Sequence, residues 1–158
     1  MKGFTLIETL LSLLIFGIIS AALLVVFSKG KETYTTSMAV LDLQASGRLA
    51  MNALCRELRQ SDTMNLTISN GNSRVDFQVP IDITVSPPTM SQNIAYYVAN
   101  NQMIREHPAG TSRVVGNDIA QVQFNLTANR LAITLQLNKI VKQRVHTLTL
   151  EKQVLLRN

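Results

Sequence analysis

The most apolar part of the chain is its N-terminal segment, residues 4–27, in which Glu8 is the only charged residue. As an α-helix this segment would be about 36 Å long, enough to cross a hydrocarbon core of about 30 Å with some tilt. A carboxylate inside such a helix costs roughly 2.5 to 3.5 kcal/mol on insertion and normally marks a functional site with a partner. The pattern predicts a membrane or filament-core helix that carries one functional acid.

A second helical pattern follows in residues 33–61, a stretch without proline in which Gly47 is the only glycine. Apolar residues recur there at steps of three and four, which is the spacing of one face of an amphipathic helix. The predicted buried face is Val40, Leu43, Gly47, Ala50, Leu54 and Leu58, and the predicted polar face is Asp42, Gln44, Arg48, Asn52, Arg56 and Arg59. Lys29-Gly30-Lys31 is the expected weak point between the two halves, and Ser61-Asp62 the expected end.

From residue 62 onward apolar and polar residues alternate, which is the period of β-strands. Asn70-Gly71-Asn72 and Ala99–Gln102 predict the turns of two hairpins, and His107–Gly110 predicts another turn. Residues 80–92, interrupted by prolines, are expected to form a surface loop.

Three further alternating runs complete the pattern of strands. They are Val122–Leu126, Leu131–Leu137 and Leu148–Leu156, and in the last of them Lys152 breaks the alternation. An antiparallel sheet with one face on a helix and one in water explains this pattern. The sequence therefore predicts an α+β fold, a long N-terminal helix packed on one antiparallel β-sheet of about six or seven strands.

Charge and cysteine content add little specific chemistry. The chain of 158 residues has a net charge of +5, and its basic residues are dispersed except for Lys139, Lys142 and Arg144. Such a cluster could contact nucleic acid, but no aromatic residue is interleaved and a solvated hairpin loop is the favoured interpretation. Cys55 is the only cysteine, so no disulfide can form within the chain, and we expect this thiol to be a small buried hydrophobe.

The sequence contains no convincing catalytic or metal-binding set. His107 and His146 are far apart, and neither lies in a cluster of cysteine, histidine or carboxylate ligands. No glycine-rich phosphate loop follows a predicted strand. We therefore expect a protein that is not an enzyme and that needs no cofactor and no metal.

Three ordinary interpretations of the N-terminal segment compete with a functional one, and one of them, a buried helix of a soluble protein, fits poorly with a run this long and apolar. Ser20-Ala21-Ala22 could serve as the cleavage site of a secretory signal, but the apolar run continues beyond it and Glu8 fits an ordinary signal poorly. The segment could also be a plain signal anchor of a single-pass membrane protein, with Glu8 incidental. The positive-inside rule does not choose an orientation, because lysines lie on both sides of the segment.

Residues Met1–Phe16, a short basic leader that ends in Gly3 before an apolar run with one acid, resemble the class III signal of type IV pilins and pseudopilins. The resemblance implies that a prepilin peptidase cleaves between Gly3 and Phe4 and methylates the new amine of Phe4. Glu8 would then be the fifth residue of the mature chain. In a filament of parallel helices, Glu8 could pair with the Phe4 amine of a neighbouring subunit and fix the axial register.

Features in the rest of the chain resemble one subgroup within this superfamily. Residues 49–60, Tyr96-Tyr97, Met103–Arg105 and the closing strand are similar to J-type minor pseudopilins of type II secretion and to their type IV pilus counterparts. This implies a structural subunit of a tip or initiation complex, anchored in the inner membrane with its globular domain outside the cytoplasm. The implied partners are other minor and major pilins, prepilin peptidase and the inner-membrane assembly platform.

The resulting organisation has four parts. Residues 1–3 are the expected leader, residues 4–28 the membrane and filament-core helix, residues 29–61 its amphipathic continuation, and residues 62–158 the globular sheet domain. Two alternatives stay open: a DNA-uptake or adhesion pilin that binds through the basic loop Lys139, Lys142 and Arg144, and a single-pass membrane protein unrelated to filaments.

Overall fold

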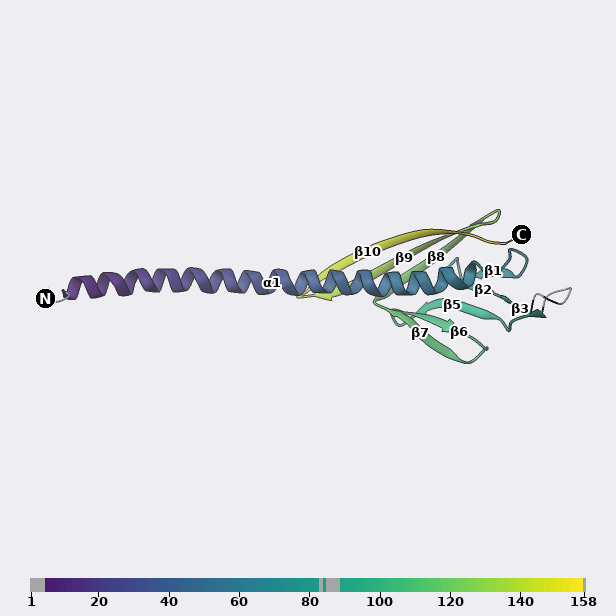
Figure 1. Cartoon of the computed structure of the whole chain (residues 1–158), viewed down its shortest axis with the longest axis horizontal. Coiled ribbons are helices and arrows are strands. Elements are labelled where there is room, and N and C mark those ends of the chain that lie inside the picture. The colour runs from purple at the N-terminus through teal and green to yellow at the C-terminus, as the bar shows by residue number, and fades with distance from the viewer. Residues whose placement is uncertain (1–4, 83, 85–88, 158) are drawn as a thin grey trace. The chain divides into compact units, whose positions relative to one another are not determined.

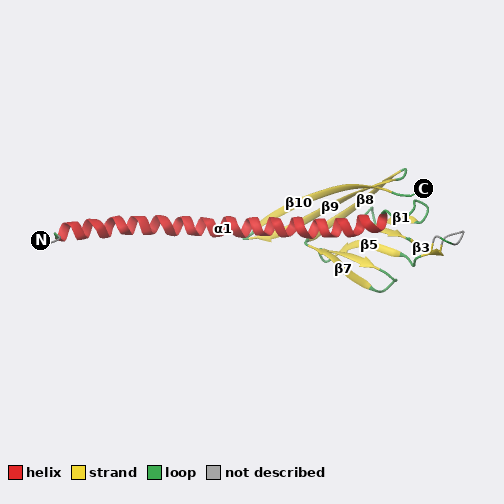
Figure 2. Ribbon diagram, viewed as in Figure 1, coloured by secondary structure: helices red, strands yellow, loops and turns green. Residues whose placement is uncertain are grey.

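One long helix precedes ten β-strands in the computed structural model, which describes residues 5–82, 84 and 89–157 (Figures 1 and 2). Helix α1 spans Leu6–Leu58, and the chain divides into two compact units, Met1–Met38 and Ala39–Asn158, to both of which α1 contributes. The combination of one N-terminal helix with antiparallel sheets confirms the predicted α+β fold.

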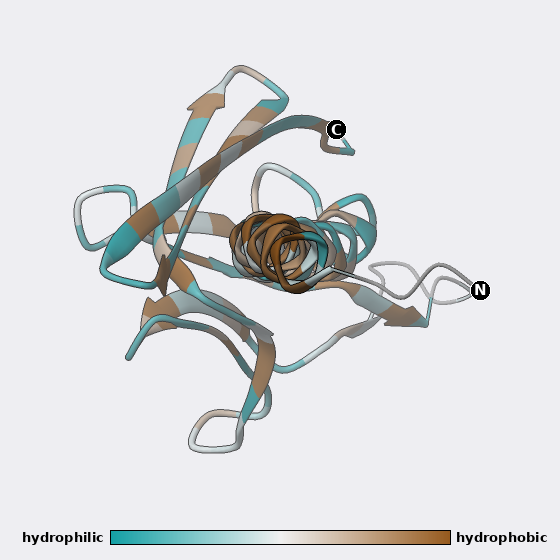
Figure 3. Cartoon of the chain, turned by 90° about the vertical axis from the view of Figure 1, so that its left-hand side faces the viewer, coloured by the Kyte–Doolittle hydropathy of each residue, from teal (hydrophilic) through white to brown (hydrophobic). Residues whose placement is uncertain are grey.

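The part of α1 in the first unit is apolar on every side from Leu6 to Phe27, as the hydropathy colouring in Figure 3 shows. Two of its serines are satisfied within the helix, since Ser12 Oγ donates to the Glu8 carbonyl and Ser28 Oγ to the Leu24 carbonyl, both at 2.8 Å. The helix continues without interruption through Gly30, the expected weak point.

The part of α1 in the second unit, Ala39–Leu58, buries one face against the strands. Its buried residues are Ala39, Leu43, Gly47, Ala50, Met51, Leu54, Cys55 and Leu58. The predicted face is therefore confirmed except for Val40, which is only partly buried. The buried stripe is wider than predicted because strands from two sheets pack against this part of the helix.

The strands form three antiparallel sheets, so the prediction of a single sheet with fewer strands is wrong. The five-stranded sheet has the order β1-β2-β5-β6-β7, the three-stranded sheet the order β10-β9-β8, and β3 pairs with β4 alone. The bounds are β1 Leu66–Ser69, β2 Arg74–Phe77, β3 Pro80–Asp82, β4 Thr89–Met90, β5 Ile94–Ala99, β6 Gln102–Glu106, β7 Ser112–Asn117, β8 Ile119–Thr127, β9 Arg130–Val141 and β10 Arg144–Leu155.

The turns follow the predicted chemistry at two hairpins. The β1–β2 turn contains Asn70, Gly71 and Asn72, all with positive φ, and the β5–β6 turn contains Asn100 and Asn101 at φ 51° and 58°. The predicted turn after β6 is also present, closed by a hydrogen bond of 2.9 Å from the Thr111 amide to the Pro108 carbonyl.

The segment 80–92 differs from the prediction of a loop. Its ends pair as the short strands β3 and β4, and the Ser91 amide donates to the Val79 carbonyl at 2.8 Å. Pairing is possible here because Pro80, which has no amide hydrogen, stands at the first position of its strand. Residues 83 and 85–88 lie outside the described residues.

The core of the second unit lies where both larger sheets meet the helix, and strands β8–β10 and β5–β7 lie on different sides of α1 in Figures 1 and 3. Two glycines mark the closest approaches. A Cβ atom on Gly47 would lie 2.6 Å from Leu150 Cδ1, and one on Gly116 would lie 2.8 Å from Ala50 Cβ. Tight packing of this kind leaves no room for a side chain at Gly116, where the neighbouring atom is fixed to the helix backbone.

A polar clasp reinforces the contact between α1 and β7. Ser46 Oγ donates to the Asn117 carbonyl at 2.8 Å and accepts from the Asn117 amide at 2.9 Å. One serine thus satisfies both backbone groups of a residue at the end of β7.

Candidate functional site

Thr5 and Glu8 contact each other at the start of α1, each through both donor and acceptor groups. The Thr5 amide and the Thr5 hydroxyl both donate to Glu8 Oε2 at 3.2 Å, and the Glu8 amide donates to the Thr5 carbonyl at 3.1 Å. A threonine followed three residues later by a glutamate is the pattern of a capping box, in which the acid satisfies an amide that the helix leaves free. A negative side chain in the first turn also interacts favourably with the helix dipole.

The large apolar side chains on both sides of Glu8 in the chain have no partner in the described residues. Leu6, Phe16 and Phe27 expose 80%, 71% and 74% of their surface, and the intervening large residues are similarly exposed. By length and composition, α1 qualifies as a membrane-spanning helix. Burial of such side chains is worth roughly 1.5 to 3 kcal/mol each, so this surface requires lipid or other helices around it.

The remaining predicted residues of the N-terminal site, Gly3 and Phe4, lie outside the described residues. Glu8 is the one member that the structure places, in the first turn of α1 and exposed. Its only described partner is Thr5, so the carboxylate retains acceptor positions for a group from another molecule.

The three basic residues Lys139, Lys142 and Arg144 do not form one loop. Lys142 and Arg144 are exposed at the turn between β9 and β10, but Lys139 lies within β9, opposite His146. Its Nζ atom is 3.2 Å from Asp42 Oδ2 and 3.5 Å from Asp118 Oδ2. The hydrogen bond to Asp42 raises the pKa of Lys139. Lys139 is thus already paired with two carboxylates, because β9 and β10 are longer than the apolar alternation indicated.

A half-buried cluster near the end of α1 is one that the sequence did not indicate. Arg105 Nε donates to both carboxylate oxygens of Glu57 at 3.0 Å, and the Tyr96 hydroxyl donates to Glu57 Oε2 at 3.1 Å. Burial, followed by the Glu57 charge, raises the pKa of Tyr96. Glu57 directly precedes the buried Leu58 on α1, and the pairing of β5 with β6 places Tyr96 and Arg105 side by side, where both reach its carboxylate.

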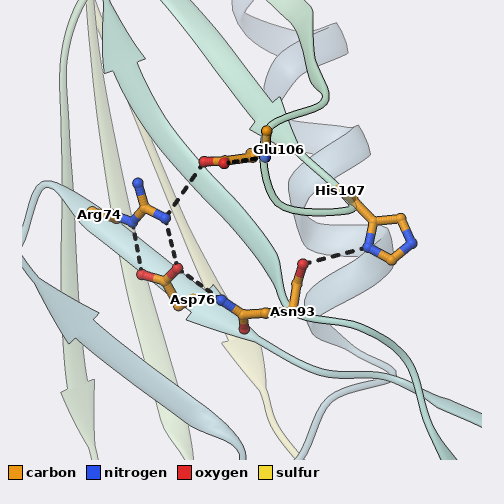
Figure 4. A network of polar contacts seen from close by, with 6 residues as sticks. Arg74, Asp76, Asn93, Glu106 and His107 are labelled. Carbon is orange, nitrogen blue, oxygen red and sulfur yellow. Dashed lines mark hydrogen bonds and ion pairs between the residues drawn. The ribbon is translucent and has the colours of Figure 1, made fainter.

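A second cluster lies on β2 and the neighbouring strands (Figure 4). Arg74 makes a two-pronged contact with Asp76, at 2.9 Å for each prong, and its Nη2 atom lies 3.6 Å from Glu106 Oε2. The Arg74 guanidinium also covers the Tyr97 ring at 5.0 Å from the ring centre. Asn93 donates to Asp76 at 3.0 Å, and His107 Nδ1 lies 3.4 Å from the Asn93 carbonyl oxygen.

Both clusters hold strands in place and contain no reactive arrangement. Each carboxylate faces a guanidinium, and His107 contacts a backbone carbonyl and no nucleophile. In the part of the chain that the structure describes, no three histidine, cysteine or carboxylate side chains gather in a way that could hold a metal ion.

Comparison with known proteins gives one match, at the N-terminus of the chain. Residues 1–24 match the family described as the prokaryotic N-terminal methylation motif. No curated protein and no solved structure matches the chain. The motif and the N-terminal apolar helix are consistent with anchoring in the inner membrane, processing by prepilin peptidase and assembly with other pilins. Residues 1–24 therefore carry the class III N-terminal methylation motif that is typical of type IV pilin-like proteins, and proteins of that kind are structural and not enzymes.

Proposed function

We propose that the chain is a minor pilin or pseudopilin, a structural subunit of the tip or initiation complex of a type IV pilus or of a type II secretion pseudopilus. The observation that carries this proposal is the coincidence of the methylation motif with a helix whose apolar side chains are exposed on every side. A subunit that inserts this helix into a bundle of similar helices would bury that surface.

In this proposal the parts of the chain have separate tasks. Residues 1–3 are removed as a leader, and the Phe4 amine is methylated. Residues 4–28 form the membrane and filament-core helix, residues 29–61 continue it, and residues 62–158 form the globular domain that makes lateral contacts. Assembly requires prepilin peptidase, the inner-membrane assembly platform, and other minor and major subunits.

Glu8 would set the axial register between subunits. Its carboxylate retains free acceptor positions, and the N-terminal amine that cleavage would create is a cation of matching charge. Each charge is costly alone among apolar helices and tolerable when paired, so the pair favours one offset between neighbouring helices.

A minor role agrees better with the chain than a major one. With Cys55 as its only cysteine, the globular domain cannot close the C-terminal disulfide loop that many major pilins have. Residues 49–60 and the Tyr96-to-Arg105 hairpin resemble J-type minor subunits.

The decisive experiment is intact-mass measurement of the chain purified from membranes that contain its own prepilin peptidase. We expect loss of residues 1–3 and one added methyl group on Phe4. Gly3→Val serves as the control and should keep the full-length mass. An unprocessed wild-type chain would favour a plain membrane anchor, and a start near Leu23 would indicate an ordinary secretory signal.

A further inference from the structure

A cavity of about 430 Å³ opens between the end of α1 and strand β10. It is lined by Asn52, Cys55, Arg56, Arg59, Gln60 and Lys152, and we call it the basic cavity. Three of these six side chains are cations and none is a carboxylate.

Lys152 occupies a position where the strand pattern calls for an apolar residue. On β10 it lies between Leu150 and Val154 on the face turned toward the helix, and Val154 is buried. Its Nζ atom donates to Asn52 Oδ1 at 3.2 Å, so the side chain crosses from the sheet to the helix. A lysine at this position places its charge beside Arg56 and Arg59, which is unfavourable without a counter-charge.

Three other cations of the second unit are each paired with a carboxylate on another element. Arg74 contacts Glu106, Arg105 contacts Glu57 and Lys139 contacts Asp42. No ion pair joins Arg56, Arg59 or Lys152 to any carboxylate in the described ranges 5–82, 84 and 89–157. Interaction of a cation with the end of the helix dipole explains Arg56, which lies in the last turn, but it does not explain Lys152.

We propose that the basic cavity binds a multivalent oxyanion, of the phosphate or carboxylate type. The planar forks of Arg56 and Arg59 suit two-pronged contact with such a group, Lys152 supplies a point charge, and the Asn52 and Gln60 amides supply neutral donors. The Cys55 thiol also senses the positive charge that surrounds the basic cavity. Burial raises its pKa, while the charges of Lys152 and Arg59 act in the opposite direction.

This inference concerns a different part of the chain from the filament-core helix, because all six lining residues belong to the second unit. The oxyanion could be a free phosphate compound or the carboxylates of an acidic segment on a neighbouring subunit. Both offer the same chemistry to the cavity, and the size and nature of the probe distinguish them.

The test is calorimetric titration of the full chain in nonionic detergent micelles, at constant ionic strength, with tripolyphosphate and separately with a tetraglutamate peptide. We expect saturable binding of at least one probe, weakened about tenfold by Lys152→Met, since a hydrogen bond to a charged group is lost. Preference for tripolyphosphate would indicate a phosphate ligand, and preference for the peptide a neighbouring subunit.

The matched control is Arg144→Gln, which removes the same charge from the exposed turn between β9 and β10 and should leave the affinity unchanged. If Lys152→Met changes the unfolding midpoint, Arg59→Gln replaces it as the cavity variant, because Arg59 is exposed and its replacement should not disturb the fold. Absence of saturable binding, or equal weakening by the Arg144→Gln and cavity variants, would overturn the proposal.

Discussion

Arg105 Nε lies 3.0 Å from each carboxylate oxygen of Glu57, and this pair joins the end of α1 to strand β6. The same carboxylate accepts the Tyr96 hydroxyl hydrogen from the adjacent strand β5 at 3.1 Å. The Glu57 and Arg105 side chains are only 20% and 21% exposed. One glutamate on the helix therefore satisfies two donors of the five-stranded sheet.

Replacement of Glu57 should destabilise the second unit. In Glu57→Ala the Arg105 and Tyr96 donors lose their acceptor, and we expect the free energy of unfolding to fall by about 1 to 3 kcal/mol. Urea unfolding followed by circular dichroism measures the change. The control is Glu151→Ala, on the exposed face of β10, which should alter stability by less than about 0.5 kcal/mol. Equal effects of the two variants would contradict a special role for Glu57.

Tyr96 predicts the behaviour of the domain at alkaline pH. Burial and Glu57 raise the pKa of Tyr96, so the folded chain keeps the phenolic proton while the unfolded chain loses it near pH 10. Stability from this group is fully present below about pH 10 and falls by about 1.4 kcal/mol per pH unit above it, until the folded-state pKa is reached.

Tyr96→Phe removes the titrating hydroxyl and should flatten that part of the alkaline decline. The measurement is the difference in unfolding free energy between wild type and variant from pH 8 to pH 11. A difference that does not change with pH would mean that Tyr96 titrates alike in the folded and unfolded chains.

Gly116 should be intolerant of any side chain. In Gly116→Ala the added methyl group would meet Ala50 Cβ at 2.8 Å and Ile119 Cδ1 at 2.9 Å, so β7 would have to move away from the helix. We expect a loss of about 1 to 3 kcal/mol in thermal or urea unfolding. Gly30→Ala, which meets nothing within 4 Å, should be neutral or slightly stabilising. A neutral Gly116→Ala would show that helix and sheet are less tightly packed than described.

In the proposed function Glu8 would have two separable tasks, capping α1 and pairing with the Phe4 amine of a neighbouring subunit, and two substitutions distinguish them. Glutamine can replace glutamate in a capping box but carries no charge, whereas alanine loses both properties. We expect Glu8→Gln and Glu8→Ala to be processed normally and both to enter filaments about tenfold less well, because the Phe4 amine lacks a counter-charge. Co-purification with the other subunits of the machine measures incorporation. Normal assembly of Glu8→Gln beside defective Glu8→Ala would assign the effect to helix capping.

The turn between β9 and β10 should be improved by glycine. Lys142 and Gln143 adopt φ values of 47° and 67°, a left-handed conformation that costs side-chain-bearing residues roughly 1 to 2 kcal/mol each. Gln143→Gly should therefore raise the free energy of unfolding by about 0.5 to 1 kcal/mol. Gln153→Gly, within the extended strand β10, is the control and should lower stability.

Much of the fold follows from local sequence features. The three- and four-residue spacing from Leu43 to Leu58 identified the buried helix face, and the asparagines at 70 and 100 identified two hairpin turns. These features act through neighbouring residues, so the sequence alone reveals them. The turn at Lys142 contains no asparagine or glycine to mark it. The sequence therefore predicts β9 and β10 as shorter strands than the structure shows.

Contacts between residues far apart in the chain could not be predicted from the sequence. Division into three sheets depends on which strands pair, and the alternation of β7 and β8 does not say that the chain changes sheets at Asp118. For the same reason Lys139 was grouped with its neighbours in sequence, although its partners are Asp42 and Asp118. The sequence shows that Lys152 breaks the alternation of its strand, but it does not show which residues surround Lys152 in the basic cavity.

The burial of Cys55 has a practical side. At 2% exposure this single thiol offers almost no surface to a second chain, although it lines the basic cavity, and burial raises its pKa and so keeps it protonated. The domain therefore has no internal disulfide to form or break when the redox potential changes. The domain should fold equally well in the reducing cytoplasm of an expression host and outside the membrane. Air oxidation during storage should not produce disulfide-linked dimers.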